Sequence, residues 1–95
     1  MSWKGQKSVA RSFSLEILTP ETCLYSGETE SVVVRTLSGE EGFMAGHSRA
    51  CKLLDVGELR FREPGAEEYR RAKVSGGFID VHGDVLVFTD SAEWK

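Results

Sequence analysis

The sequence contains few cysteines and histidines, the residues that stabilise many small domains through disulfides or zinc sites. It has two cysteines, Cys23 and Cys51, with no Cys-x-x-Cys pair, and only two histidines. A four-ligand zinc site in a recognisable spacing cannot be built from this set. Each cysteine lies in an apolar stretch, where cysteine behaves as a small hydrophobe, so we expect two free thiols in a reducing compartment, with a disulfide as the alternative. The sequence therefore predicts neither a metal nor a cofactor.

Long apolar runs and a surplus of basic residues are also missing. No run approaches the ~20 apolar residues that a membrane helix needs. The 95 residues carry a formal net charge of −3, and from Ser12 onward nine basic residues face fifteen acidic ones. A nucleic-acid surface would need the opposite sign. We therefore expect no membrane span and no nucleic-acid partner.

No segment of useful length has a helical period, whereas short alternating or β-branched segments recur at close spacing. Ten glycines against two prolines favour a turn-rich fold. These features predict an all-β domain over residues 13–95, a sandwich or flattened barrel of eight or nine strands, after a flexible tail of residues 1–12. The expected strands are 13–18, 23–25, 31–35, 50–54, 58–62, 68–74 and the two arms of a hairpin within 73–90. Residues 58–62 alternate strictly, which predicts Leu59 and Phe61 inward. We expect the charged residues of strands 58–62 and 68–74 to form a solvated, mixed-charge outer face: Glu58, Arg60, Arg62, Glu68 and Arg70.

The hairpin at residues 73–90 is the stretch around which the other strands are arranged. His82-Gly83-Asp84 supplies turn residues between two arms rich in β-branched and aromatic residues. Gly76 and Gly77, adjacent at the start of the first arm, predict a bulge or a very close approach of another backbone. Both arms carry apolar residues on both faces, so we expect the hairpin to be central and covered by other strands.

The segment from Leu37 to His47 is the candidate functional segment of the chain. Its three glycines predict a loop that folds back on itself, and Phe43 and Met44 between them either pin the loop to the core or present it to a partner. The neighbouring Glu40 and Glu41 form an acid/base couple, bind a cation or, more simply, make a solvated polar tip.

The residues that catalysis would need are present but badly spaced. A nucleophile elbow requires Gly-x-Ser-x-Gly, yet Lys73 stands where the first glycine around Ser75 should be. His47 lies next to Ser48, and sequence neighbours are rarely placed as base and nucleophile. We therefore predict no catalytic residues, and a small hydrolase using Ser75 or His47 is the least favoured alternative.

Taken in order, several motifs resemble the epsilon subunit of F-type ATP synthases, called delta in mitochondria. The resemblance covers about Phe13 to Glu93, and its most recognisable piece is Val74-Ser75-Gly76-Gly77-Phe78-Ile79-Asp80-Val81. The other similar pieces are Leu15 to Glu21, Leu24 to Glu28 with Ser31-Val32, Gly39 to Phe43 with Gly46-His47, Val56 to Arg60, and Thr89 to Glu93.

Two departures from the family pattern flank His47. Ala45 stands where the family usually has proline, and Ser48-Arg49-Ala50-Cys51 replaces a segment that typically begins Ala-Pro. Losing both prolines relaxes the loop on each side of His47. The family also continues into a C-terminal helical hairpin with a regulatory role, and we expect a chain ending at Lys95 to lack that hairpin.

The resemblance implies a β-sandwich of ten strands in two five-stranded sheets. It implies a non-catalytic subunit of the central stalk that couples the gamma subunit to the c-subunit ring, peripheral to the cytoplasmic face of a bacterial plasma membrane. Its contact residues would be Glu40, facing polar loops of the c ring, with Phe43, Met44 and His47 against the ring or gamma. The alternative is an unrelated β-sandwich module that binds a peptide or a sugar through the same glycine-rich segment.

Overall fold

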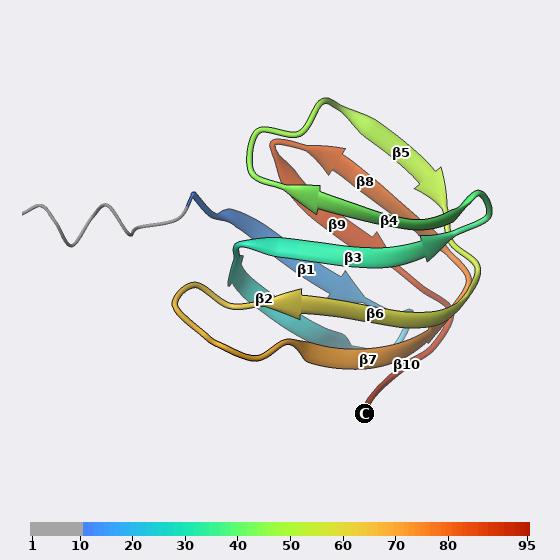
Figure 1. The fold of residues 1–95 in the computed structure, drawn as a ribbon. Helices are drawn as coiled ribbons and strands as arrows, with labels where there is room; N and C mark the ends of the chain where they lie inside the picture. Colours follow the sequence, from blue (N-terminus) through green and yellow to red (C-terminus); the bar gives the residue numbers. More distant parts are fainter. Residues whose placement is uncertain (1–10) are drawn as a thin grey trace, which may run out of the picture.

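The computed structural model describes residues 11–95, which form ten strands and no helix (Figure 1). The described part therefore contains no helix that could cross a membrane. The expected tail of residues 1–12 lies outside the described residues, apart from Arg11 and Ser12. The strands are β1 (Phe13–Leu18), β2 (Cys23–Thr29), β3 (Ser31–Thr36), β4 (Gly39–Met44), β5 (Ala50–Leu53), β6 (Val56–Arg62), β7 (Arg70–Ser75), β8 (Phe78–His82), β9 (Asp84–Phe88) and β10 (Ala92–Trp94).

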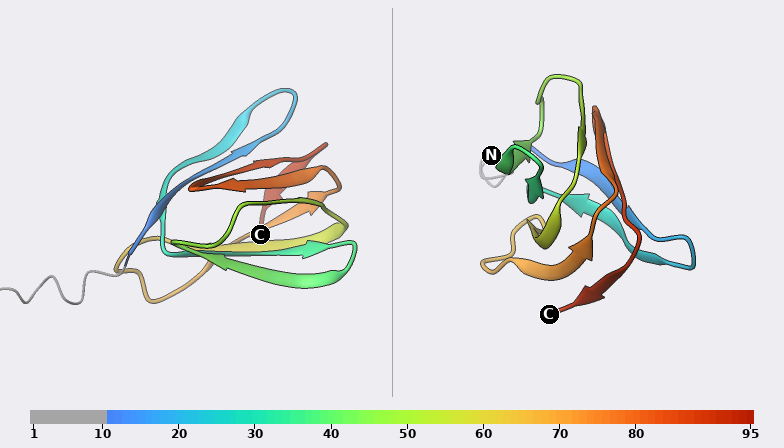
Figure 2. Two further views of the ribbon diagram at one scale, coloured as in Figure 1. Left: turned by 90° about the horizontal axis from the view of Figure 1, so that it is seen from above. Right: turned by 90° about the vertical axis from the view of Figure 1, so that its right-hand side faces the viewer.

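The strands build two five-stranded sheets that pack face to face (Figures 1 and 2). Sheet A has the order β2-β1-β9-β8-β5, and sheet B has the order β10-β7-β6-β3-β4. Within these sheets β1 and β9 run parallel, whereas the other neighbours are antiparallel. The predicted all-β sandwich of two five-stranded sheets is confirmed.

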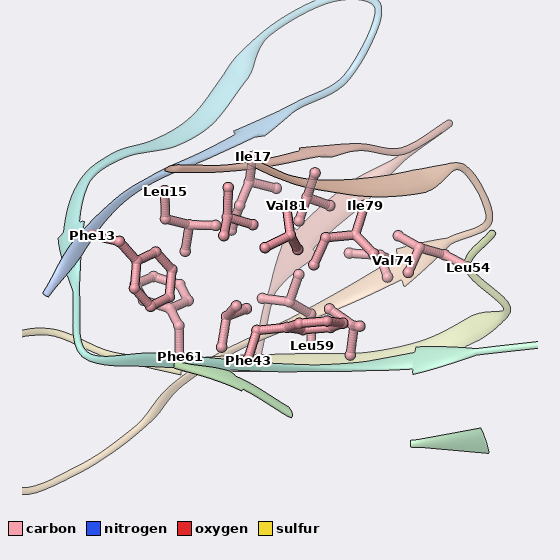
Figure 3. Packing of buried hydrophobic residues seen from close by; sticks show 14 residues of the cluster. Phe13, Leu15, Ile17, Phe43, Leu54, Leu59, Phe61, Val74, Ile79 and Val81 are labelled. Carbon is pink, nitrogen blue, oxygen red and sulfur yellow. The ribbon is translucent and has the colours of Figure 1, made fainter. Parts of the chain in front are cut away.

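The core lies between the sheets and comes from strict alternation along the strands (Figure 3). In β6 the buried Leu59 and Phe61 alternate with outward charged residues, as the sequence predicts. The hairpin of β8 and β9 contributes Ile79 and Val87, both fully buried. Because side chains in a strand alternate between faces, one face of each sheet supplies the core and the other remains outside.

Two glycines just before β8, Gly76 and Gly77, lie where the chain passes close to the backbone at the end of β9. Gly77 has φ +103°, and a Cβ built on it would lie 1.9 Å from the carbonyl oxygen of Phe88 and 2.7 Å from the Cα of Thr89. Gly76, at φ +74°, would place its Cβ no closer than 3.5 Å to the side chain of Asp90. The predicted close approach of another backbone to the glycine pair is confirmed. It occurs at Gly77, where any side chain would collide with that backbone.

The side chain of Arg70 lies over aromatic rings at the margin of the sandwich where β2 faces β7 and β10. The guanidinium of Arg70 lies 4.2 Å from the ring centre of Trp94 and 5.5 Å from that of Tyr25. Arg70 pairs in register with the buried Phe61, so its side chain is on the inner side of sheet B. The expectation that Arg70 belongs to a solvated outer face is therefore wrong, because register, not charge, sets the face of a strand residue.

Three other expectations need correction. The predicted loop at residues 37–47 contains a true strand, β4, because each of its residues from Gly39 to Met44 pairs with β3. Residues 91–95, for which the sequence predicts no strand, contribute the short edge strand β10. Both free cysteines, Cys23 and Cys51, are exposed rather than packed in an apolar setting, because their strand positions face outward.

Candidate partner-binding site

Strand β4 forms one edge of sheet B and carries three of the four residues predicted to contact a partner. Glu40 and Met44 point outward, and Met44 is 66% exposed. Four residues of extended chain separate them, which corresponds to about 13 Å along the edge. We call Glu40, Met44 and His47 the β4 surface.

Phe43 lies on the opposite side of the strand. Its side chain is 1% exposed and sits in the core between the two sheets (Figure 3). The sequence left open whether this residue would pin the segment to the core or present it to a partner, and the structure shows the first. Phe43 is therefore omitted from the β4 surface, since a buried ring cannot touch a partner unless the sandwich opens.

Glu40 forms an ion pair with an arginine on β6, a strand that is separated from β4 by β3. The Nη1 of Arg60, on β6, donates to Oε2 of Glu40 at 3.0 Å, and the Glu40 side chain remains 56% exposed. Exposed ion pairs are worth only about 0–1 kcal/mol, so this pair orients the carboxylate without locking it. An incoming donor can replace Arg60 at little cost.

Glu41 faces the other way and is used inside the fold. Its carboxylate lies 3.3 Å from Nζ of Lys52 on β5 and accepts a hydrogen bond from Thr36 Oγ1 at 3.1 Å. This ion pair bridges sheet B to sheet A across the margin between β4 and β5. Glu40 and Glu41 therefore lie on opposite faces of one strand and do not form an acid/base couple.

His47 belongs to the turn that follows β4. Its backbone N–H donates to the carbonyl of Met44 at 3.1 Å, and Gly46 supplies the positive φ of +84° that the turn requires. The imidazole stands edge-on to the ring of Phe43, with 4.7 Å between centroids, and its Nδ1 is 2.7 Å from the carbonyl oxygen of Ser48. The buried Phe43 thus positions His47 at the end of the β4 surface.

The site offers contacts rather than reactive groups. Ser75 hydrogen-bonds the hydroxyl of Ser91 at 2.8 Å at one end of sheet B, and His47 lies at the other end, beyond Met44. The described residues hold no cluster of three or more histidine, cysteine or acidic side chains that could bind a metal ion. The geometry thus separates the residues that a small hydrolase would have to combine.

Sequence reasoning missed Arg60 as the partner of Glu40. The two residues are 20 positions apart, and they meet because β3 lies between β4 and β6. The strict alternation of residues 58–62 shows that Arg60 points outward but not which strand lies beside it. Only the strand order of sheet B supplies the pairing.

Comparison with known proteins places these observations in a family. The family described as "ATP synthase, Delta/Epsilon chain, beta-sandwich domain" matches residues 12–95. The ATP synthase epsilon chain of Brevibacillus brevis is 40% identical over 81 residues, which cover 84% of this chain and 61% of the relative. That of Alkaliphilus metalliredigens is 37% identical over 87 residues, covering 90% and 63%. The chain spans about three-fifths of the length of the curated relatives that it matches.

Solved structures share the fold at low sequence identity. A chain in the OSCP/F1/c-ring structure of the Euglena gracilis mitochondrial ATP synthase has a TM-score of 0.83 and 23% identity, with 99% of this chain and 60% of that chain covered. The family match takes in nearly all of the described residues, and the glycine pair, the alternation of β6 and the turn before His47 all lie within it. This chain belongs to the ATP synthase delta/epsilon family, and residues 12–95 are its β-sandwich domain.

Proposed function

We propose that this protein is a non-catalytic subunit of the central stalk of an F-type ATP synthase, where it couples the gamma subunit to the c-subunit ring. The observation that carries the proposal is the family match over residues 12–95, whose curated relatives are named ATP synthase epsilon chains. In this role the protein is peripheral to the cytoplasmic face of the membrane through the complex. Family membership removes the support for an unrelated sugar- or peptide-binding module.

The architecture suits a part that transmits torque. Close-packed protein interiors have low compressibility, so two sheets with an interdigitated core resist deformation better than loops or a single helix. An ion pair and a cation–π contact also tie the sheets together at the two margins, through Lys52–Glu41 on one side and Arg70 with Tyr25 on the other. A rotor segment with these properties turns as one body.

We assign contact with the c ring to the β4 surface. Glu40 presents a carboxylate held by an exposed ion pair, and Met44 adds a flexible apolar contact farther along the same outer side of β4. His47 closes the surface at the turn. Because its Nδ1 faces the carbonyl oxygen of Ser48, Nε2 of the neutral ring is the nitrogen that can accept a hydrogen bond from a partner. A mixed surface of this kind fits polar loops that carry donors and a few apolar side chains.

The test is retention of the subunit on membranes that contain c rings and gamma but lack this subunit. Glu40→Gln removes the charge and keeps the shape, and we expect retention to fall about tenfold, as for the loss of one charged hydrogen bond of about 1.4 kcal/mol. Met44→Ser and His47→Ala should each weaken retention in the same direction.

Glu93→Gln is the matched control. Glu93 is an exposed carboxylate on the same outer face of sheet B, but on β10 at the opposite edge. It should leave retention unchanged. Wild-type retention of the Glu40, Met44 and His47 variants would remove the assignment of the β4 surface, and failure of the unaltered protein to bind such membranes would contradict the proposed function.

A further inference from the structure

A cavity of about 370 Å³ lies at the end of sheet B where β4 and β6 finish and β3 begins. It is lined by Arg11, Glu30, Met44, Ala45 and Arg62, and we call it the corner cavity. Of these residues only Met44 belongs to the β4 surface. Small-molecule sites usually have about 300–1,000 Å³, so the corner cavity is large enough for a small ligand.

The acid of the corner cavity is already compensated. Glu30 is 8% exposed, and one of its carboxylate oxygens accepts a hydrogen bond from Nη2 of Arg62. The other accepts a hydrogen bond from the backbone N–H of Gly65 at 3.1 Å. A buried charge needs such partners. Glu30 therefore orients Arg62 at the cavity wall, and its charge does not call for a bound cation.

The arginines of the corner cavity have hydrogen-bond donors to spare. The guanidinium of Arg62 carries five N–H donors, of which the hydrogen bonds to Glu30 and to the carbonyl of Ala66 use two. No carboxylate among the described residues forms an ion pair with Arg11. Its guanidinium lies against Gly46, where a Cβ would stand 3.0 Å from Nη2. Two arginines and one carboxylate leave the cavity with an excess of positive charge, although the whole chain carries −3.

A third donor lies between two of the lining residues. Ser31 pairs in register with Met44 on one side and with Arg62 on the other, and it points outward because the next residue, Val32, is in the core. Ser31 is 9% exposed, and its Oγ is buried without a hydrogen-bond partner among the described residues. Buried hydroxyls nearly always have a partner. This unpartnered donor, next to a cavity rich in donors, indicates a ligand that brings acceptors.

We propose that the corner cavity binds the phosphate group of a phosphate ester, either a soluble ester or a lipid headgroup. Arg11, Arg62 and Ser31 approach from three different segments, which suits a tetrahedral oxyanion better than a planar carboxylate. Guanidinium groups bind phosphate oxygens through pairs of parallel hydrogen bonds. Met44 and Ala45 supply an apolar wall for the rest of the ester, and the flexible methionine can move to open Ser31 to the ligand. This activity goes beyond the coupling role and does not depend on it.

The experiment titrates the full chain with butyl phosphate and follows the backbone amide signals by NMR. The signals of Ser31 and Gly46 should shift along one saturable curve. Arg11→Gln should weaken binding about tenfold, as for the loss of one charged hydrogen bond. Ser31→Ala should weaken it about two- to tenfold without lowering Tm, because no hydrogen bond within the described fold is lost. Arg62 is kept, since its loss would leave the buried carboxylate of Glu30 without its ion-pair partner.

Arg49→Gln is the matched control. Arg49 is an exposed arginine in the turn after β4, without an ion pair among the described residues, and it does not line the corner cavity. It should bind butyl phosphate within about twofold of the unaltered protein, because it removes the same charge away from the site. Equal weakening by Arg11→Gln and Arg49→Gln would show general attraction of anions and would refute the site.

Vesicles distinguish the two sources of the phosphate group. If the protein binds vesicles of phosphatidylglycerol but not of phosphatidylcholine, and Arg11→Gln alone abolishes this binding, the ligand is a lipid headgroup. If it binds butyl phosphate but neither kind of vesicle, the ligand is a soluble ester. Binding to neither butyl phosphate nor vesicles would overturn the proposal. The proposed function would be unaffected, because it is tested separately by retention on membranes that contain c rings.

Discussion

Replacing Gly77 by alanine is the sharpest test of the packing between β8 and β9. The new Cβ would stand 1.9 Å from the carbonyl oxygen of Phe88 and 2.7 Å from Cα of Thr89, both backbone atoms that cannot rotate away. Gly77 also has φ +103°, a conformation that costs a residue with a side chain roughly 1–3 kcal/mol. Moving two packed strands apart adds about 1–3 kcal/mol, as overpacking does in other cores.

We therefore expect Gly77→Ala to lower the free energy of unfolding by about 1–5 kcal/mol, after about 0.4–1 kcal/mol is regained from the stiffer unfolded chain. A domain of this size has roughly 5–14 kcal/mol in total. The loss corresponds to a fall in Tm of about 4–40 °C, at ~4–8 °C per kcal/mol. Urea unfolding followed by circular dichroism measures it, and the slope of the transition should stay unchanged.

Gly83→Ala is the control for this measurement. Gly83 has φ +77°, but no described heavy atom lies within 4 Å of a Cβ built on it beyond its chain neighbours. It therefore has backbone strain without the collision, and we expect a loss of about 1–2 kcal/mol at most. If Gly77→Ala is no more destabilising than Gly83→Ala, the close approach of the two backbones does not matter, and the reasoning is refuted.

Two further predictions concern the charged residues that border the sandwich. Arg70→Met should lower the free energy of unfolding by about 1 kcal/mol, because the stacking on Trp94 is lost. Arg71→Met, on the outer face, is the control and should lower it by less. Equal losses of the two variants in urea unfolding would contradict the stacking. At Glu58, burial opposes ionisation, but hydrogen bonds and charge from Lys95 and Arg71 outweigh it and hold the pKa of the carboxyl below its ordinary 4.5. The stability that the ionised Glu58 contributes is present above about pH 4.5 and is lost as the pH falls through the lowered pKa of its carboxyl. Glu58→Gln should therefore be less stable than the unaltered protein at neutral pH and equally stable in acid. A stability difference that does not shrink in acid would show that the ion pairs are not its source.

The strands and the close backbone contact at the glycine pair could be predicted from the sequence because they depend on local chemistry. Alternation assigned Leu59 and Phe61 to the core, since the period of a strand is two and does not depend on the partner strand. The β4 segment was misread because glycine density is typical of loops, whereas an edge strand can tolerate glycine at an outward position such as Gly42. The candidate site was partly predictable for the same reason: Glu40, Met44 and His47 are exposed, as residues that contact a partner must be, whereas Phe43 is buried.

The sequence by itself determined the all-β class, the turn at Gly83, the inward residues of β6 and the need for a close backbone contact at Gly77. Each follows from the preferences of one residue and its immediate neighbours. Only the tertiary structure decided that β9 lies parallel to β1, that Arg60 reaches Glu40 and that Leu53, Phe78, Phe88 and Leu18 align in one row. Strand order and register depend on contacts between residues far apart in the chain, and no local pattern specifies which of several similar strands will be neighbours.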